Sequence, residues 1–180
     1  MVRHDEAPGG RDKLLFTPGP LTTSARVKRA MLRDLGSRDA EFLAVVRQVR
    51  AALLRIAGVA EPDWTALPVQ GSGTYAIEAT LGTLIPREGR LLVAHNGAYG
   101  ERIVRLARAL HIAVQSIDVA EDAPLSADAI GRALDADPTI GFVAVVHCET
   151  STGQINPIPD IASAVHARGR RLIVDAMSSF

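Results

Sequence analysis

Cysteine and aromatic residues are scarce in this sequence of 180 residues. Cys148 is the single cysteine, and aromatic side chains make up 4% of the chain. One cysteine excludes an internal disulfide and any zinc site built from several cysteines. No charge predominates either, because 20 basic side chains balance 20 acidic ones. Without a basic stripe, nucleic acid is not expected as a partner.

Long apolar runs are also missing. The longest strongly apolar run covers residues 142–146, far short of the ~20 residues that a membrane-spanning helix needs. Residues 1–13 contain Pro8, Gly9 and Gly10 but no apolar signal core, so we expect a disordered tail and a cytoplasmic protein. The hydrophobic share of 47% favours a folded domain that acts on small molecules.

From residue 66 onward, short apolar runs alternate with helical patterns. These patterns predict strands at 66–70, 91–95, 113–118, 142–147 and 172–175, and helices at 73–85, 99–110, 126–134 and 159–167. Upstream of residue 66, the sequence predicts helices at 24–35 and 40–57. Strands and helices that alternate at this spacing are typical of βαβ units. The predicted fold class is therefore α/β, a mostly parallel sheet with helices on both faces. The continuous apolar runs favour strands that are buried on both sides, including the last one.

Small polar residues follow the predicted strands. They form four segments, 70–74, 95–99, 147–153 and 175–179. Because ligands bind at the carboxyl ends of parallel strands, this clustering is the main sign of function.

The loop Gly71-Ser72-Gly73-Thr74 follows a predicted strand and opens a helix. Free N–H groups, the helix dipole and two hydroxyls suit a phosphate dianion. An ordinary glycine-rich turn is the plain alternative. The loop also reads G-x-G-x-x-A through Ala76, but a dinucleotide site needs an acidic residue about 20 positions later. The next strand ends in His95-Asn96-Gly97, so a dinucleotide is disfavoured.

Asp175 and Tyr99 are the other candidates for ligand contacts. Asp175 ends a strand predicted to be buried, where a carboxylate needs a cation or hydrogen-bond donors. A ligand cation would satisfy it, and so would the N–H groups of the following turn. Tyr99 is one of two tyrosines and opens a helix. It suits stacking on a planar ligand, although packing is the commoner role of such a residue.

Together these segments resemble the class V (fold type I) pyridoxal-phosphate aminotransferases. The sequences GSGT, NGAYG, HCETSTG and VDAMSSF carry the likeness. The opening LLFTPGPLTTS, together with QGSGTYAIEA and NGAYG, is most similar to the 2-aminoethylphosphonate:pyruvate aminotransferases. Alanine– and serine–glyoxylate aminotransferases share the general plan. The resemblance implies that residues 14–180 hold the N-terminal part and most of the large cofactor-binding domain, without the C-terminal part and the small domain.

The resemblance also implies roles for individual residues. Those assigned to pyridoxal 5'-phosphate are Ser72, Gly73 and Thr74 around its phosphate, Tyr99 stacked on its ring, Thr150 near its phenolic oxygen, Asp175 on its ring nitrogen and Met177 on its other face. Asp175 is the one catalytic residue among them. Thr17, Pro18, Gly19 and Pro20 match a loop that lines the substrate entrance. No metal ligand is implied.

The implied reaction converts 2-aminoethylphosphonate and pyruvate into phosphonoacetaldehyde and alanine. The substrates would be a small amino donor and a 2-oxo acid. The full-length form would be a homodimer, and it would not associate with a membrane. The family binds its cofactor as a Schiff base on a lysine downstream of the matching aspartate. Here the only lysines are Lys13 and Lys28. We therefore expect a fragment that is inactive alone, with a non-catalytic cofactor-binding or interaction module as the alternative.

Overall fold

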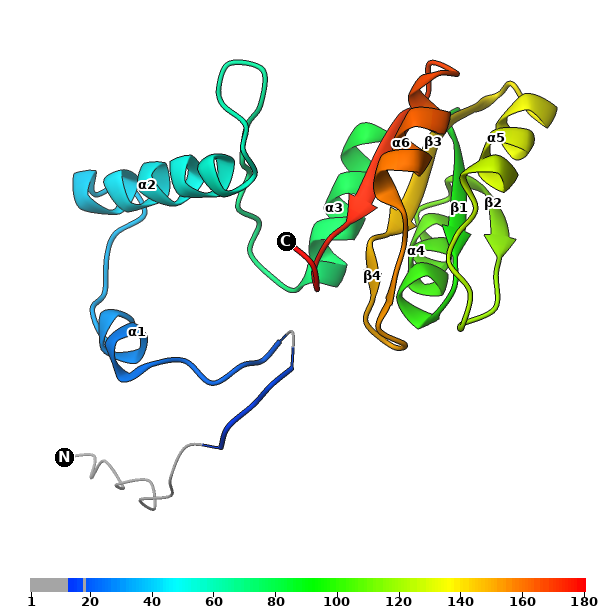
Figure 1. Ribbon diagram of the computed structural model, residues 1–180. Helices are drawn as coiled ribbons and strands as arrows, with labels where there is room; N and C mark the ends of the chain where they lie inside the picture. The colour runs from blue at the N-terminus through cyan, green and yellow to red at the C-terminus, as the bar shows by residue number, and fades with distance from the viewer. Residues whose placement is uncertain (1–12, 18) are drawn as a thin grey trace. The chain divides into compact units, whose positions relative to one another are not determined.

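The computed structural model describes residues 13–17 and 19–180. The chain divides into two compact units, residues 1–67 and 68–180. Their helices and strands are drawn in Figure 1. The predicted tail at 1–13 lies outside the described residues, apart from Lys13. In the described part of the chain, no helix combines the length and the apolar character needed to cross a bilayer.

The first unit contains the helices α1 (Ala25–Ala30) and α2 (Ala40–Ile56). Ser24 begins α1, because its Oγ accepts a 3.3 Å hydrogen bond from the N–H of Val27. The prediction that this helix extends to residue 35 is wrong. None of its residues is buried, and a short helix without packing has little to prolong it. The prediction for α2 is confirmed to within one residue, and Gly58 follows it with φ +70°.

The second unit is built on a four-stranded parallel sheet of order β2-β1-β3-β6. Its elements are α3 (Gly73–Leu84), β1 (Arg90–His95), α4 (Ala98–Ala109), β2 (Ala113–Asp118), α5 (Ala127–Ala136), β3 (Ile140–Val146), β4 (Cys148–Glu149), β5 (Gln154–Ile155), α6 (Ile158–His166) and β6 (Arg171–Asp175). The predicted α/β class is confirmed. The antiparallel pair β4 and β5 was not predicted.

Alternate residues of the central strands point to opposite faces of the sheet. Leu91 and Val93 pack in one apolar cluster, which α3 and α4 complete. Leu92 and Ala94 pack in a second cluster, which α5 and α6 complete. Helices therefore cover both faces, as the βαβ pattern predicted. The two apolar clusters bury β1 and β3 on both faces of the sheet. This packing holds the loops at the ends of these strands in place.

One predicted strand is absent, and the predicted burial of another is wrong. Residues 66–70 form no strand, and Leu67 is 75% exposed. A strand needs a partner for its hydrogen bonds, and no described strand pairs with this segment. The strand β6 exists, but its residues are half-buried or exposed rather than buried. The reason is its place at the edge of the described sheet, where only β3 pairs with it.

Candidate functional site

The direction in which successive strands are added to the sheet reverses beside β1. The chain passes from β1 to its neighbour β2 and then returns to place β3 on the other side of β1. In open parallel sheets, ligands bind at the carboxyl ends of the strands at such a switch point. The segments that leave β1 and β3 there carry Tyr99 and Thr150, so the topology brings two predicted site residues to one edge.

The start of α3 has the features of an anion site. Ser72 caps the helix, and its Oγ accepts a 3.4 Å hydrogen bond from the N–H of Tyr75. Gly73 and Thr74 are the first two residues of the helix, where N–H groups have no acceptor within the helix. These N–H groups and the positive end of the helix dipole favour a bound phosphate.

Asp175 ends β6, and Met177 follows it in the C-terminal turn. One carboxylate oxygen, Oδ1, accepts a 3.0 Å hydrogen bond from the N–H of Met177. Asp175 is half-buried, so the premise of a fully buried carboxylate is wrong, because β6 lies at the edge of the sheet. This hydrogen bond is the turn-capping contact that the sequence allowed for Asp175 as an alternative to a ligand.

Gly73 and Asp175 line the same cavity. The cavity measures about 220 Å³ and lies between α3 and the end of β6. A Cβ atom on Gly73 would lie 3.4 Å from the sulfur of Met177, so this side chain packs directly against the first turn of α3. The structure therefore brings the predicted phosphate contact and the predicted ring contact to one place. The volume is below the roughly 300 Å³ typical of complete ligand pockets.

Tyr99 is held by a residue that sequence reasoning missed. The guanidinium carbon of Arg102 lies 4.6 Å from the centroid of the Tyr99 ring. Arg102 also donates a 3.1 Å hydrogen bond to Oγ1 of Thr74. One cation thus joins the stacking candidate on α4 to the phosphate candidate on α3. The spacing of three residues on one helix was the available signal, since such residues share a face.

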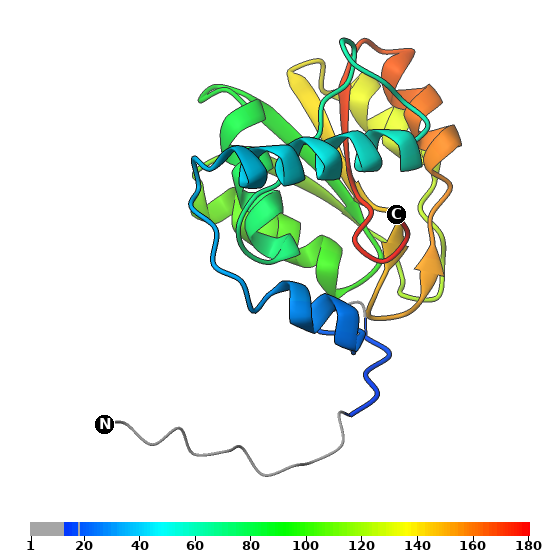
Figure 2. The same ribbon diagram turned by 90° about the vertical axis from the view of Figure 1, so that its left-hand side faces the viewer.

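Thr150 lies against the C-terminal turn. Its Oγ1 is 2.6 Å from Oγ of Ser178. Figure 2 shows this turn, in red, beside β4 in orange. The hydroxyl of Thr150 is therefore placed on the same side of the sheet as the turn that follows Asp175.

Glu149 is the second residue that sequence reasoning missed. Its side chain is fully buried, and its carboxylate accepts hydrogen bonds from the N–H groups of Tyr99 and Gly100, both at 3.1 Å. No local pattern reveals this contact with α4, because the two N–H donors are 49 and 50 residues away in the sequence.

The predicted entrance loop belongs to the first unit. Pro18 lies outside the described residues. Oγ1 of Thr17 donates a hydrogen bond to the carbonyl of Pro20, while Gly19 is exposed. The role of Thr17, Pro18, Gly19 and Pro20 at a substrate entrance stays a prediction.

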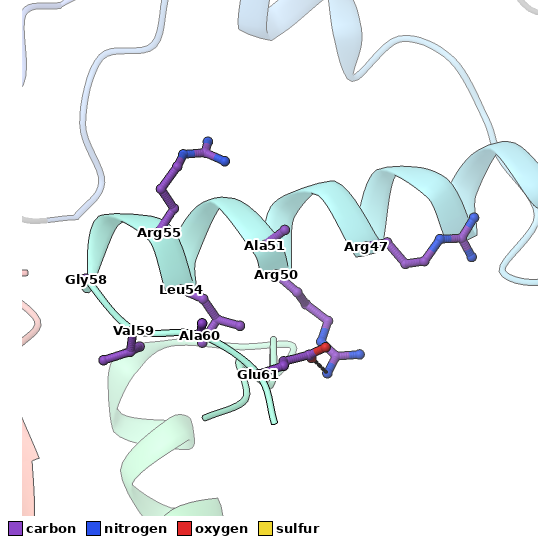
Figure 3. Close-up of a pocket in the computed structure, with 9 residues that line it drawn as sticks. All are labelled: Arg47, Arg50, Ala51, Leu54, Arg55, Gly58, Val59, Ala60 and Glu61. Carbon is purple, nitrogen blue, oxygen red and sulfur yellow. Dashed lines mark hydrogen bonds and ion pairs between the residues drawn. The ribbon is translucent and has the colours of Figure 1, made fainter. Parts of the chain in front are cut away.

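A separate hollow of about 750 Å³ lies within the first unit, between α2 and the loop after it. Figure 3 shows Arg47, Arg50 and Arg55 along the helix and Glu61 on the loop. Arg50 donates 2.8 Å hydrogen bonds to the carbonyl of Ala66 and to Oγ1 of Thr65, and pairs with Glu61 at 3.4 Å. Its guanidinium is therefore engaged in holding this loop against α2.

The fold and the matching family model define the class of this protein. The model for class V aminotransferases matches residues 22–180, and the chain belongs to that family. Proteins named 2-aminoethylphosphonate–pyruvate transaminase from Burkholderia thailandensis and Burkholderia pseudomallei are 55% identical to it over 170 residues. The matched region is 94% of this chain and 46% of either relative. The chain thus spans about half the length of these curated relatives.

Solved structures share the fold. Alanine–glyoxylate aminotransferase from Nostoc sp. superimposes with a TM-score of 0.85 at 28% identity, over 99% of this chain and 46% of that one. Pyridoxamine–pyruvate aminotransferase from Mesorhizobium loti gives a TM-score of 0.83 at 27% identity, over 97% of this chain and 44% of that one.

Pyridoxal phosphate is the cofactor that this family membership implies. The described residues fit parts of it. The first turn of α3 suits its phosphate, and the cavity beside Gly73 adjoins a carboxylate, Asp175, that suits its ring nitrogen. The chain has no lysine after Lys28, so the second unit contains none.

Proposed function

We propose that residues 68–180 bind pyridoxal phosphate between the start of α3 and the end of β6. We propose further that the full-length protein transfers an amino group from 2-aminoethylphosphonate to pyruvate. The observation that carries the cofactor proposal is that Gly73 and Asp175 line the same cavity. One small molecule can contact Gly73 with its phosphate and Asp175 with its ring only if both residues line one cavity.

Each residue then has a defined task. The N–H groups of Gly73 and Thr74, with the hydroxyl groups of Ser72 and Thr74, hold the phosphate. Asp175 would keep a proton on the ring nitrogen of the bound cofactor, because opposite charges about 4 Å apart attract by roughly 4 kcal/mol at an effective dielectric constant near 20. The bound cofactor supplies the electron sink that transamination requires.

Three further side chains orient the ring. Tyr99 would stack on one face of the ring, and Met177 would pack on the other. Thr150 would donate a hydrogen bond from its hydroxyl group to the phenolic oxygen. Both Tyr99 and Thr150 follow strands at the switch point of the sheet, which supports these tasks.

The substrates are proposed from the relatives. The curated proteins at 55% identity carry the name 2-aminoethylphosphonate–pyruvate transaminase, and this supports an aminophosphonate donor with a 2-oxo acid acceptor. The alternative is an alanine– or serine–glyoxylate reaction, supported by the fold shared with the Nostoc enzyme. We propose a homodimer for the full-length form.

The chain by itself is proposed to be inactive. Its lysines are Lys13 and Lys28, both upstream of the residues assigned to the cofactor. The family uses a lysine after the matching aspartate to hold the cofactor and to move the substrate proton. Residues 14–180 would then supply most of the large domain without this group. Transamination by the isolated chain above the rate of free pyridoxal phosphate would contradict this proposal.

A titration tests the cofactor site. Pyridoxal phosphate is added to the 180-residue chain, and binding is followed by the circular dichroism that the achiral cofactor acquires in a protein site. We expect Asp175→Ala to weaken binding about tenfold, equivalent to ~1.4 kcal/mol. Asp160→Ala, at an exposed position on α6, is the matched control and should bind as the wild type does. Equal affinities of wild type and Asp175→Ala, or no signal from the wild type, would overturn the proposal.

A further inference from the structure

We infer that Glu149 is a positioning residue that fixes Tyr99 and Thr150 relative to each other. The inference rests on the proposed function, in which these two side chains contact the cofactor ring. Glu149 contacts no proposed ligand atom itself. It lies in β4, directly before Thr150, while its hydrogen-bond donors lie at the start of α4.

The carboxylate of Glu149 accepts four hydrogen bonds. Oε1 accepts from the N–H of Tyr99 at 3.1 Å and from the N–H and hydroxyl of Ser151 at 3.3 and 2.6 Å. Oε2 accepts from the N–H of Gly100 at 3.1 Å. An ionised carboxylate only accepts hydrogen bonds, so these four donors match it. The positive end of the α4 dipole adds to this stabilisation.

The surrounding backbone is shaped around this side chain. A Cβ atom on Gly97 would lie 2.5 Å from Cγ of Glu149 and 2.7 Å from Oγ of Ser151. Only glycine leaves room for the carboxylate to reach the first turn of α4. The N–H of Ala98 also donates a 3.3 Å hydrogen bond to Oγ of Ser151. The start of α4 and the turn after β4 are thus joined at several points through one buried carboxylate.

This arrangement has a consequence for the ring contacts. Tyr99 stands on the first turn of α4, and Thr150 is covalently next to Glu149. If the carboxylate loses its donors, the two side chains are free to shift relative to each other. Misplacement by about 1 Å is sufficient to spoil a reacting geometry. Glu149 therefore controls the orientation of the bound ring, in addition to stabilising the fold.

Glu149→Gln tests this inference, because it keeps the shape but replaces one acceptor oxygen with an NH₂ donor that faces N–H groups. The readout is the induced circular dichroism of pyridoxal phosphate per bound cofactor, at saturation and below the unfolding temperature. We expect it to fall about twofold or more, because this signal reports a fixed ring orientation, and we expect affinity to fall roughly tenfold. The control Val165→Ala removes buried apolar volume on the opposite face of the sheet and should lower the unfolding temperature without changing the signal.

Ser151→Ala is the second variant, in case Glu149→Gln fails to fold. It removes the 2.6 Å donor while the backbone donors remain, so a smaller loss of the signal is expected. A wild-type signal in Ser151→Ala, or in folded Glu149→Gln at saturation, would overturn the inference while leaving the proposed function standing. If the wild type itself binds no cofactor, the proposed function fails and the inference fails with it.

Discussion

The side-chain amides of Asn96 and Asn156 exchange two hydrogen bonds, 2.9 and 3.1 Å long, across 60 residues of sequence. Both residues are 1% exposed. Asn156 also accepts a 3.0 Å hydrogen bond from the N–H of Leu125 and donates one of 2.9 Å to the carbonyl of Val146. The pair thus connects the ends of β1 and β3 to the segment that precedes α5.

Replacing Asn156 should reveal how much this connection stabilises the fold. Asn156→Ala leaves several buried polar groups without partners, at about 1–3 kcal/mol for each such group. We expect the free energy of unfolding to fall by about 3 kcal/mol, as measured by urea denaturation. Gln154→Ala removes an exposed amide that bonds to Ile155 and should change it by less than about 0.5 kcal/mol. A loss below about 1 kcal/mol for Asn156→Ala would contradict this role.

Two glycines in neighbouring helices should respond to alanine in opposite directions. A Cβ atom on Gly100 would lie 2.3 Å from Cβ of His95, whereas one on Gly82 would meet nothing within 4 Å. Gly100→Ala should therefore destabilise the protein by about 2 kcal/mol or more through overpacking. Gly82→Ala lies within α3 and should stabilise it by about 0.5–1 kcal/mol through helix propensity. Thermal unfolding of both variants measures these effects, and equal shifts of the unfolding temperature would refute the close approach of α4 to β1.

Arg102 and Arg105 provide a matched comparison on α4. Arg102 contacts Thr74 and the ring of Tyr99, while Arg105 pairs with Glu101 at 3.7 Å on an exposed face. We expect Arg102→Ala to cost about 1–2 kcal/mol of stability, from one hydrogen bond and one cation–π contact. Arg105→Ala should cost less than about 0.5 kcal/mol. Chemical denaturation measures both values, and equal costs would count against the bridge between α3 and α4.

The ion pair between α5 and the end of α6 should make stability depend on pH. Arg168 donates hydrogen bonds of 2.7 and 2.8 Å to the two carboxylate oxygens of Asp135, and these lower the pKa of Asp135 below its ordinary value of 3.8. A lowered pKa means that the contribution to stability is present above pH 3.8 and is lost as the pH falls through the folded-state pKa.

Arg168→Ala should return the pKa of Asp135 toward 3.8, because the hydrogen bonds and the nearby positive charge are removed. An NMR titration of the Asp135 carboxyl carbon measures this shift directly. High salt should reduce the difference between wild type and variant, since both side chains are accessible to ions. A pKa that stays unchanged in Arg168→Ala would show that another group lowers it.

Local patterns were sufficient for most of the fold. The strand β2 occupies the residues that its apolar pattern predicted, 113–118, and Ser126 caps α5 by accepting a hydrogen bond from Ala129. Hydrophobic period and capping depend on residues within one or two turns of each other. For the same reason, the α/β class and the gathering of polar residues at strand ends could be predicted from the sequence.

Long-range pairing decided the rest. The segment 66–70 has a strand-like pattern but no described partner, so it forms no strand, and residues 67–70 are exposed. The edge position of β6 leaves Asp175 half-buried. The shared cavity of Gly73 and Asp175 depends on the packing of α3 near β6.

The sequence by itself therefore determined the α/β class and, to within two residues, the bounds of α2 to α6 and of β1, β2, β3 and β6. The tertiary structure decided that the carboxylate of Glu149 caps a helix whose N–H donors lie 49 and 50 residues away. The physical reason is that periodicity and capping are local interactions, whereas burial and strand order bring distant residues together.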